Sequence, residues 1–113
     1  MRSGHLARLA RVSTDTLRHY ERLGLLPLPR RTPSNYRDFA PSAKRRVTLI
    51  QRALRVGFSL AELKAILAVR DKGGAPCHQV HHLLREKIRA MDDKIAALVA
   101  WRGHVKRLLR HWD

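Results

Sequence analysis

The sequence predicts a mostly α-helical protein in which a small winged helix-turn-helix domain precedes one long antiparallel coiled-coil helix. Three observations predict this fold class. Short apolar-periodic segments fill residues 1–72. A proline-rich stretch without helical period interrupts them at residues 27–39. A register at heptad spacing, mostly apolar, then runs from Cys77 to Trp112, in a segment whose only helix breaker is Gly103.

The elements of the first domain follow from local signals. A helix-turn-helix is expected over about residues 4–24, with Ser13 capping its second helix and Gly24 ending it. A small hairpin, or wing, is expected over residues 27–39. Two further helices are expected over about residues 41–70. The second of these starts at an S-x-x-E capping box formed by Ser59 and Glu62.

The long helix should pair with another helix. Steps of four and three residues from Cys77 give an apolar seam that is too long to bury against a domain of this size, so a second copy of the chain is the expected partner. The alternative is a helix folded back onto its own domain. The dimerisation residues predicted are Leu84, Ile88, Met91, Ile95, Leu98, Val105, Leu109 and Trp112.

The charge of the chain predicts a polyanionic partner. Its 113 residues carry a formal net charge of +15. Residues 1–57 hold 13 Lys/Arg against 3 Asp/Glu, whereas residues 58–113 hold 11 against 6. The basic half is also the half with the short-helix pattern, which favours nucleic acid as the partner over a merely solubilising basic face.

Several classes of protein are excluded by the composition. A single cysteine, Cys77, allows no intramolecular disulfide and fits a reducing compartment. No apolar run approaches the roughly 18 residues of a membrane span, and no signal peptide is evident, so a cytoplasmic protein without a membrane partner is expected. The sequence has no paired carboxylates in one segment, phosphate-binding glycine loop or nucleophile elbow, so an enzyme is not expected.

Four motifs in order resemble one family. They are T-L-R-H-Y-E-R-L-G-L-L-P at 16–27, R-x-x-S-x-Y-R at 31–37, G-F-S-L-x-E-L at 57–63, and a glycine-rich linker into a long helix. Together they resemble MerR-type bacterial transcription regulators over essentially the whole chain.

The resemblance implies a function. A homodimer would bind double-stranded promoter DNA whose spacer is too long. In response to an effector it would distort that DNA so that RNA polymerase can use the promoter. Two alternatives remain at this point: a basic structural protein that binds nucleic acid without sequence preference, and a regulator of this type that responds to an organic ligand.

The same resemblance places the DNA contacts on the second helix and the wing. Tyr20 could instead be a core aromatic, and Arg22 could be an ordinary exposed charge. General surface charge is the interpretation we favour for Arg45, Arg46 and Arg55. Asn35 replaces the usual wing glycine, and asparagine tolerates the left-handed backbone that the turn needs. The predicted DNA-binding residues are Thr14, Thr16, Arg18, His19, Tyr20, Arg22, Arg30, Arg31, Asn35, Tyr36 and Arg37.

The effector is expected near the start of the long helix. Cys77 resembles the first cysteine of metal-responsive members, but no later cysteine follows, so the usual all-thiolate site is not expected. Cys77 and His81 are four residues apart on one helix face, and His78 lies beside them. With His111 of the partner subunit they could bind Zn²⁺ or another divalent metal. A reactive thiol at a helix N-terminus and a purely structural cysteine are the alternatives.

Overall fold

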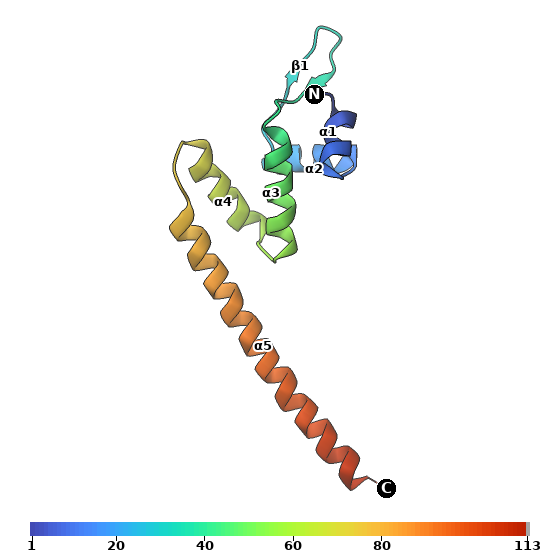
Figure 1. Ribbon diagram of the computed structural model, residues 1–113, viewed down its shortest axis with the longest axis vertical. Helices are drawn as coiled ribbons and strands as arrows, with labels where there is room; N and C mark the ends of the chain where they lie inside the picture. Colours follow the sequence, from blue (N-terminus) through green and yellow to red (C-terminus); the bar gives the residue numbers. More distant parts are fainter. Residues whose placement is uncertain (113) are drawn as a thin grey trace. The chain divides into compact units, whose positions relative to one another are not determined.

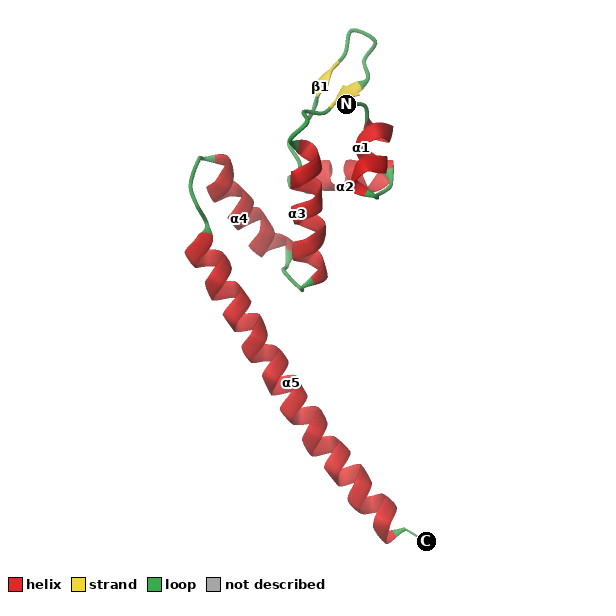
Figure 2. Ribbon diagram, viewed as in Figure 1, coloured by secondary structure: helices red, strands yellow, loops and turns green. Residues whose placement is uncertain are grey.

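The computed structural model describes residues 1–112 and divides the chain into two compact units, residues 1–75 and the segment from Pro76 onward. The order of elements is α1, α2, β1, β2, α3, α4 and α5 (Figure 1). Helices dominate, and the only strands among the described residues are the two short ones of the wing (Figure 2). The predicted fold class, a helix-turn-helix fold with a long C-terminal helix, is confirmed.

The helix-turn-helix consists of α1 (Ser3–Ala10) and α2 (Thr14–Arg22). Arg11 ends α1 in the left-handed region, at φ 58°. Ser13 caps α2 as predicted, because its side chain accepts a hydrogen bond from the Thr16 amide at 3.0 Å. Gly24, at φ 74°, turns the chain away after the last turn of α2.

The wing is a minimal hairpin. Strand β1 (Arg30–Arg31) pairs antiparallel with β2 (Arg37–Asp38). Asn35 sits in the turn at φ 64°, which is the left-handed conformation expected where the family motif has glycine. The Thr32 amide donates to the Tyr36 carbonyl oxygen at 2.8 Å and closes the hairpin.

Two helices complete the first unit. They are α3 (Ala43–Arg55) and α4 (Leu60–Asp71). The predicted capping box is present at the start of α4, where the side chains of Ser59 and Glu62 each bond the other's backbone amide. The core is aliphatic with two aromatic side chains, and its members are Leu6, Ala7, Ala10, Leu17, Tyr20, Leu25, Leu26, Phe39, Ala43, Val47, Ile50, Leu63 and Leu67.

The second unit is the single helix α5 (Cys77–His111), 35 residues and about 52 Å long. None of its residues is buried. Trp112, the last residue predicted for the seam, is the C-cap of the helix and has an extended backbone conformation. Over the described part of the chain, no helix combines the length and the apolar character needed to cross a membrane.

Candidate nucleic-acid interface and signal site

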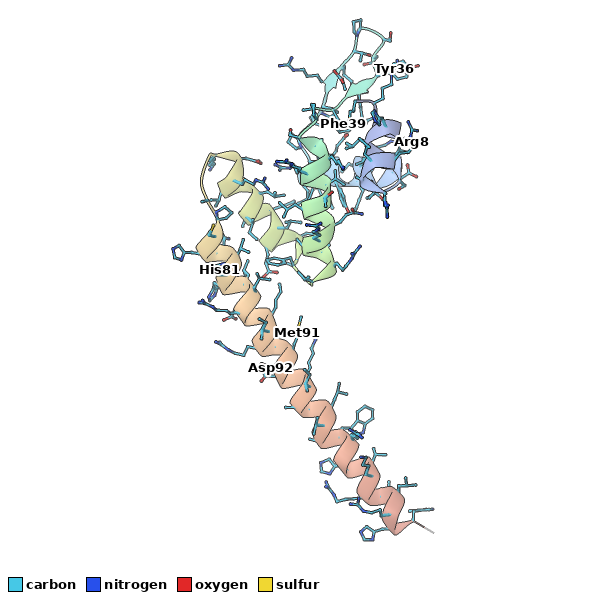
Figure 3. The ribbon with its side chains drawn as sticks, viewed as in Figure 1. Arg8, Tyr36, Phe39, His81, Met91 and Asp92 are labelled. Atoms are coloured by element: carbon cyan, nitrogen blue, oxygen red, sulfur yellow. The ribbon has the colours of Figure 1, made fainter. Side chains whose placement is uncertain are left out.

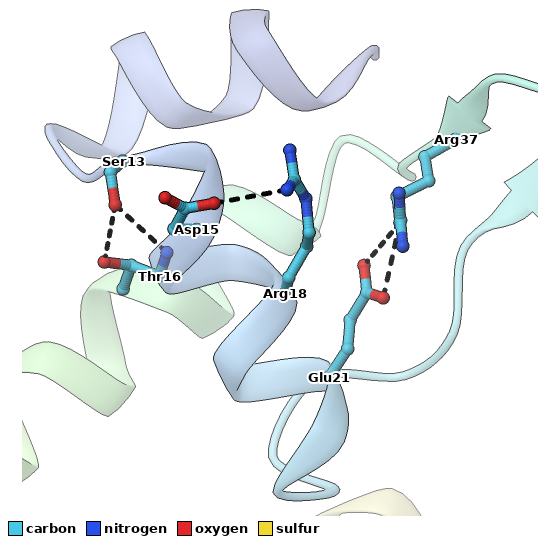
Figure 4. A network of polar contacts seen from close by, with 6 residues as sticks. All are labelled: Ser13, Asp15, Thr16, Arg18, Glu21 and Arg37. Carbon is cyan, nitrogen blue, oxygen red and sulfur yellow. Dashed lines mark hydrogen bonds and ion pairs between the residues drawn. The ribbon is translucent and has the colours of Figure 1, made fainter.

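Helix α2 presents a basic surface. Arg18, His19 and Arg22 are exposed on it. Among residues 1–112, the polar partner of the Arg18 side chain is Asp15, one turn earlier, at 3.2 Å between Nη1 and Oδ1 (Figure 4). Such an exposed pair contributes little to stability, so the guanidinium remains available to a phosphate or a base edge.

The two threonines predicted as DNA contacts are less accessible. Thr14 and Thr16 are both half-buried. The hydroxyl of Thr16 is also hydrogen bonded to Ser13 Oγ at 2.9 Å, as part of the α2 cap. The structure therefore gives Thr16 a structural role, and its contact with DNA stays a prediction.

Tyr20 belongs to the core. Its side chain is buried, and desolvation raises the pKa of its phenol above the usual value. The motif places an aromatic residue here, and in the structure its side chain is only 7% exposed and belongs to the core cluster. This burial favours the core interpretation that the sequence left open.

Glu21 is a residue that the sequence analysis did not select. Its carboxylate lies 3.2 Å from Arg37 Nε, and the glutamate side chain is only 7% exposed (Figure 4). Arg37 was predicted to bind DNA, but its side chain is 27% exposed and is directed at Glu21. The pair ties the wing to α2 across 16 residues of sequence, and no local pattern announces such a contact.

The remaining wing cations are accessible. Arg30 and Arg31 are exposed, and Arg31 also donates from Nη1 to the Asn35 carbonyl oxygen at 3.2 Å. The guanidinium of Arg2 lies 4.5 Å from the centre of the Tyr36 ring, in a cation–π contact. The basic side chain of Arg2, just before α1, therefore lies against the wing.

The N-terminal residue also fixes the wing. The Met1 ammonium donates to Asp38 Oδ1 at 2.8 Å, and it lowers the pKa of that carboxyl below its usual range. The Met1 carbonyl oxygen accepts from the Phe39 amide at 2.6 Å. The wing is thus bound to the residue that begins the segment before α1, as well as to α2.

Arg46 differs from the surface charge that was expected. It donates from Nε to the Leu25 carbonyl oxygen at 2.7 Å and from both terminal nitrogens to the Asp71 carboxylate. Its side chain is 16% exposed. Arg45 and Arg55, which were also expected to be general surface charge, are exposed.

The predicted signal residues lie on α5. Cys77, His78, His81 and His111 are all exposed, and Cys77 is the first residue of the helix. Figure 3 shows His81 in the first part of this helix. Within one chain, residues 1–112 contain no group of three or more His, Cys, Asp and Glu side chains placed to hold a metal ion. Cys77 and His81, the two predicted ligands that are four residues apart, both belong to α5.

Two family profiles match the chain. The profile for "MerR HTH family regulatory protein" matches residues 1–69, and the profile for "MerR, DNA binding" matches residues 44–108. Among solved structures, the chain resembles the regulator PbrR691 from Ralstonia metallidurans CH34 in complex with lead(II). That likeness has a TM-score of 0.82 and 31% identity, and it covers 100% of this chain and 88% of the other.

Sequence relatives agree. A mercuric resistance operon regulatory protein of Bacillus cereus is 37% identical over 86% of this chain and 74% of its own length. The regulator ZntR of Escherichia coli K12 is 30% identical over 95% of this chain and 77% of its own length. These relatives are transcription regulators and not enzymes. From the matched profiles, the fold and these identities, the chain belongs to the MerR family of helix-turn-helix transcription regulators.

Proposed function

We propose that this chain is a homodimeric promoter-binding regulator that responds to a metal ion or a thiol-reactive signal near Cys77. It would act by distorting a promoter with an over-long spacer so that RNA polymerase can use it. The observation that carries the proposal is the combination of a basic helix-turn-helix unit with a long helix whose apolar seam is exposed. The relatives named for mercury resistance and the structure with lead(II) support the kind of signal.

The seam of α5 supports the dimer. Ile88, Ile95 and Leu98 are each more than half exposed, at 58%, 58% and 57%. Met91 lies on the same seam, and Figure 3 shows it leaving the helix on a different side from Asp92. Large aliphatic side chains at heptad spacing are stable in water only when a partner covers them. An antiparallel second copy is the partner we propose.

Replacing Ile95 with Asp tests the dimer, because it places a charge in the seam. Sedimentation equilibrium should show a dimer for the unchanged chain and a monomer for Ile95→Asp. Ala96→Asp adds the same charge about a third of a turn away and should remain dimeric. A monomeric unchanged chain would contradict the proposal.

To test DNA recognition, the protein is first used to select its preferred binding fragment from a pool of random DNA duplexes. Binding to that fragment and to random DNA should be measured as a function of salt. Arg18→Gln should lower affinity and reduce the slope of log K against log[salt] by about 1 if Arg18 binds a phosphate, or relax base preference if it binds a base edge. Arg85→Gln on α5 removes the same charge and should change neither.

The outcome of this experiment also separates the alternatives. A regulator should prefer its selected site over random DNA by roughly 10³-fold or more at fixed salt. A structural nucleic-acid protein would bind both about equally, with the same salt slope. Equal binding would therefore replace our proposal with that one.

The signal is tested by titrating the reduced, oxygen-free protein with Co²⁺ and then with Zn²⁺. A near-ultraviolet thiolate-to-metal band that is lost in Cys77→Ser would identify a metal ligand. Without a band, loss of the free thiol after treatment with a thiol-reactive compound, together with altered promoter binding, would identify a reactive thiol. If neither response is observed, the result would favour an organic ligand and contradict the proposed signal.

A further inference from the structure

Arg46 joins two segments that are far apart in sequence. Near the start of α3, its Nε donates to the Leu25 carbonyl oxygen at 2.7 Å. Its Nη1 and Nη2 donate to Oδ1 and Oδ2 of Asp71 at 2.6 and 3.1 Å. A guanidinium bound to both oxygens of a carboxylate is held in one orientation, which a lysine ammonium would not be. We call Arg46, the Leu25 carbonyl and Asp71 the Arg46 clamp.

One end of the Arg46 clamp is fixed to α2, the predicted recognition helix. The amides of Leu25 and Leu26 donate to the Tyr20 carbonyl oxygen at 3.0 and 3.3 Å and close the end of the helix. The Leu25 side chain is fully buried. The carbonyl that accepts from Arg46 therefore moves with the recognition helix.

The other end of the Arg46 clamp is fixed to the turn by which the chain leaves α4. Asp71 is the last residue of α4, and Gly73 follows at φ 83°. The Gly74 amide donates to the Val69 carbonyl oxygen at 3.0 Å. A Cβ at Gly74 would lie 2.9 Å from Val69 Cγ1, so the turn is tightly packed. We call residues 71–74 the exit turn, and the first residue of α5 comes three positions later.

The other cations of α3 do not behave in this way. Lys44, Arg45, Arg52 and Arg55 are exposed, and within residues 1–112 none of their side chains forms a hydrogen bond or an ion pair. Arg46 alone among them is largely withdrawn from solvent and directed at an acid on another helix. The hydrogen bond from Arg46 holds the pKa of Asp71 below its usual value, in agreement with a carboxylate that is charged in the folded protein.

We propose that Arg46 is a positioning residue for promoter recognition, which fixes the exit turn relative to the recognition helix. This inference rests on the proposed function. A dimer that reads two half-sites must place its recognition helices about one DNA turn, ~34–36 Å, apart. Each added base pair moves one half-site along the duplex and rotates it. A rigid link from the recognition helix to the exit turn makes the dimer selective for one spacing, and a loose link makes it tolerant of several.

The experiment measures affinity for operators in which the two half-sites are moved apart or together by one and two base pairs. For the unchanged chain, a change of one base pair should weaken binding at least about tenfold, as a mismatched contact does. In Arg46→Met the penalty should fall to less than about threefold. Asp71→Asn should act in the same direction but more weakly, because its amide oxygen can still accept a hydrogen bond.

Arg52→Met is the matched control, since it removes the same charge from the exposed face of the same helix. It should leave the ratio of affinities between spacings unchanged. All variants are compared at a temperature where circular dichroism shows them folded. Spacing ratios in Arg46→Met equal to those of the unchanged chain would overturn the inference. If the unchanged chain binds an inverted repeat no more tightly than random DNA, the proposed function itself would be overturned.

Discussion

Loss of the Glu21–Arg37 pair should destabilise the first unit strongly. Replacing Arg37 with Met leaves the Glu21 carboxylate, which is 7% exposed, without its cation. Removing one partner of a buried pair typically costs about 3–5 kcal/mol. Arg37 is itself 27% exposed, so water can reach the site, and we expect about 2–3 kcal/mol. For a unit of this size that corresponds to a fall in Tm of roughly 10–20 °C.

The assay must report on the first unit alone. Both tryptophans lie at positions 101 and 112, outside that unit, so their fluorescence does not monitor it. Urea titration followed by amide hydrogen exchange of peptides from residues 1–75, at one protein concentration, isolates the effect.

Two controls make the comparison specific. Arg18→Met breaks the exposed Arg18–Asp15 pair and should cost less than about 1 kcal/mol. The double variant Arg37→Met/Glu21→Leu removes both charges and should recover most of the lost stability. A stability of Arg37→Met within about 0.5 kcal/mol of the unchanged chain would refute the reasoning. So would a double variant as unstable as the single one.

Three further results are expected. Because the pKa of Asp71 is lowered by Arg46, the pair stabilises the fold at pH values above the usual carboxyl value of 3.8 and ceases to do so as the pH falls through the lower folded value. The urea midpoints of the unchanged chain and Asp71→Asn should therefore differ at neutral pH and converge in acid. Ser59→Ala should cost about 1 kcal/mol and speed amide exchange most in the first turn of α4, whereas amides that exchange by global unfolding should speed up by no more than about fivefold. Gly74→Ala should lower the midpoint of thermal denaturation, since its methyl group meets Val69, and an unchanged midpoint would show that the exit turn is not tightly packed.

Local signals predicted most of the fold. The capping box at Ser59, the left-handed Asn35 and the cap at Ser13 each depend on neighbouring residues, and each is present in the structure. The heptad spacing likewise predicted one uninterrupted helix from Cys77, and the glycine at 103 does not break it. These features are fixed within a few residues of the chain, so sequence alone was sufficient.

The polar contacts of the site could not be predicted in the same way. Arg46 meets partners 21 and 25 residues away, and Arg37 meets one 16 residues away. An arginine in a basic segment has the same appearance whether it faces solvent, DNA or a distant acid, and only the packing of the helices distinguishes these cases. Burial of Tyr20 is a similar case, because its position in the motif fits both a surface and a core side chain.

The exposed seam of α5 has a consequence for how promoter occupancy depends on the concentration of the chain. No residue of this helix is buried in the single chain. If two copies must join before either can hold a promoter, then at low expression the active form rises with the square of the amount of chain. Doubling synthesis would then raise the active form about fourfold. A modest change in expression would thus produce a steep change in promoter occupancy.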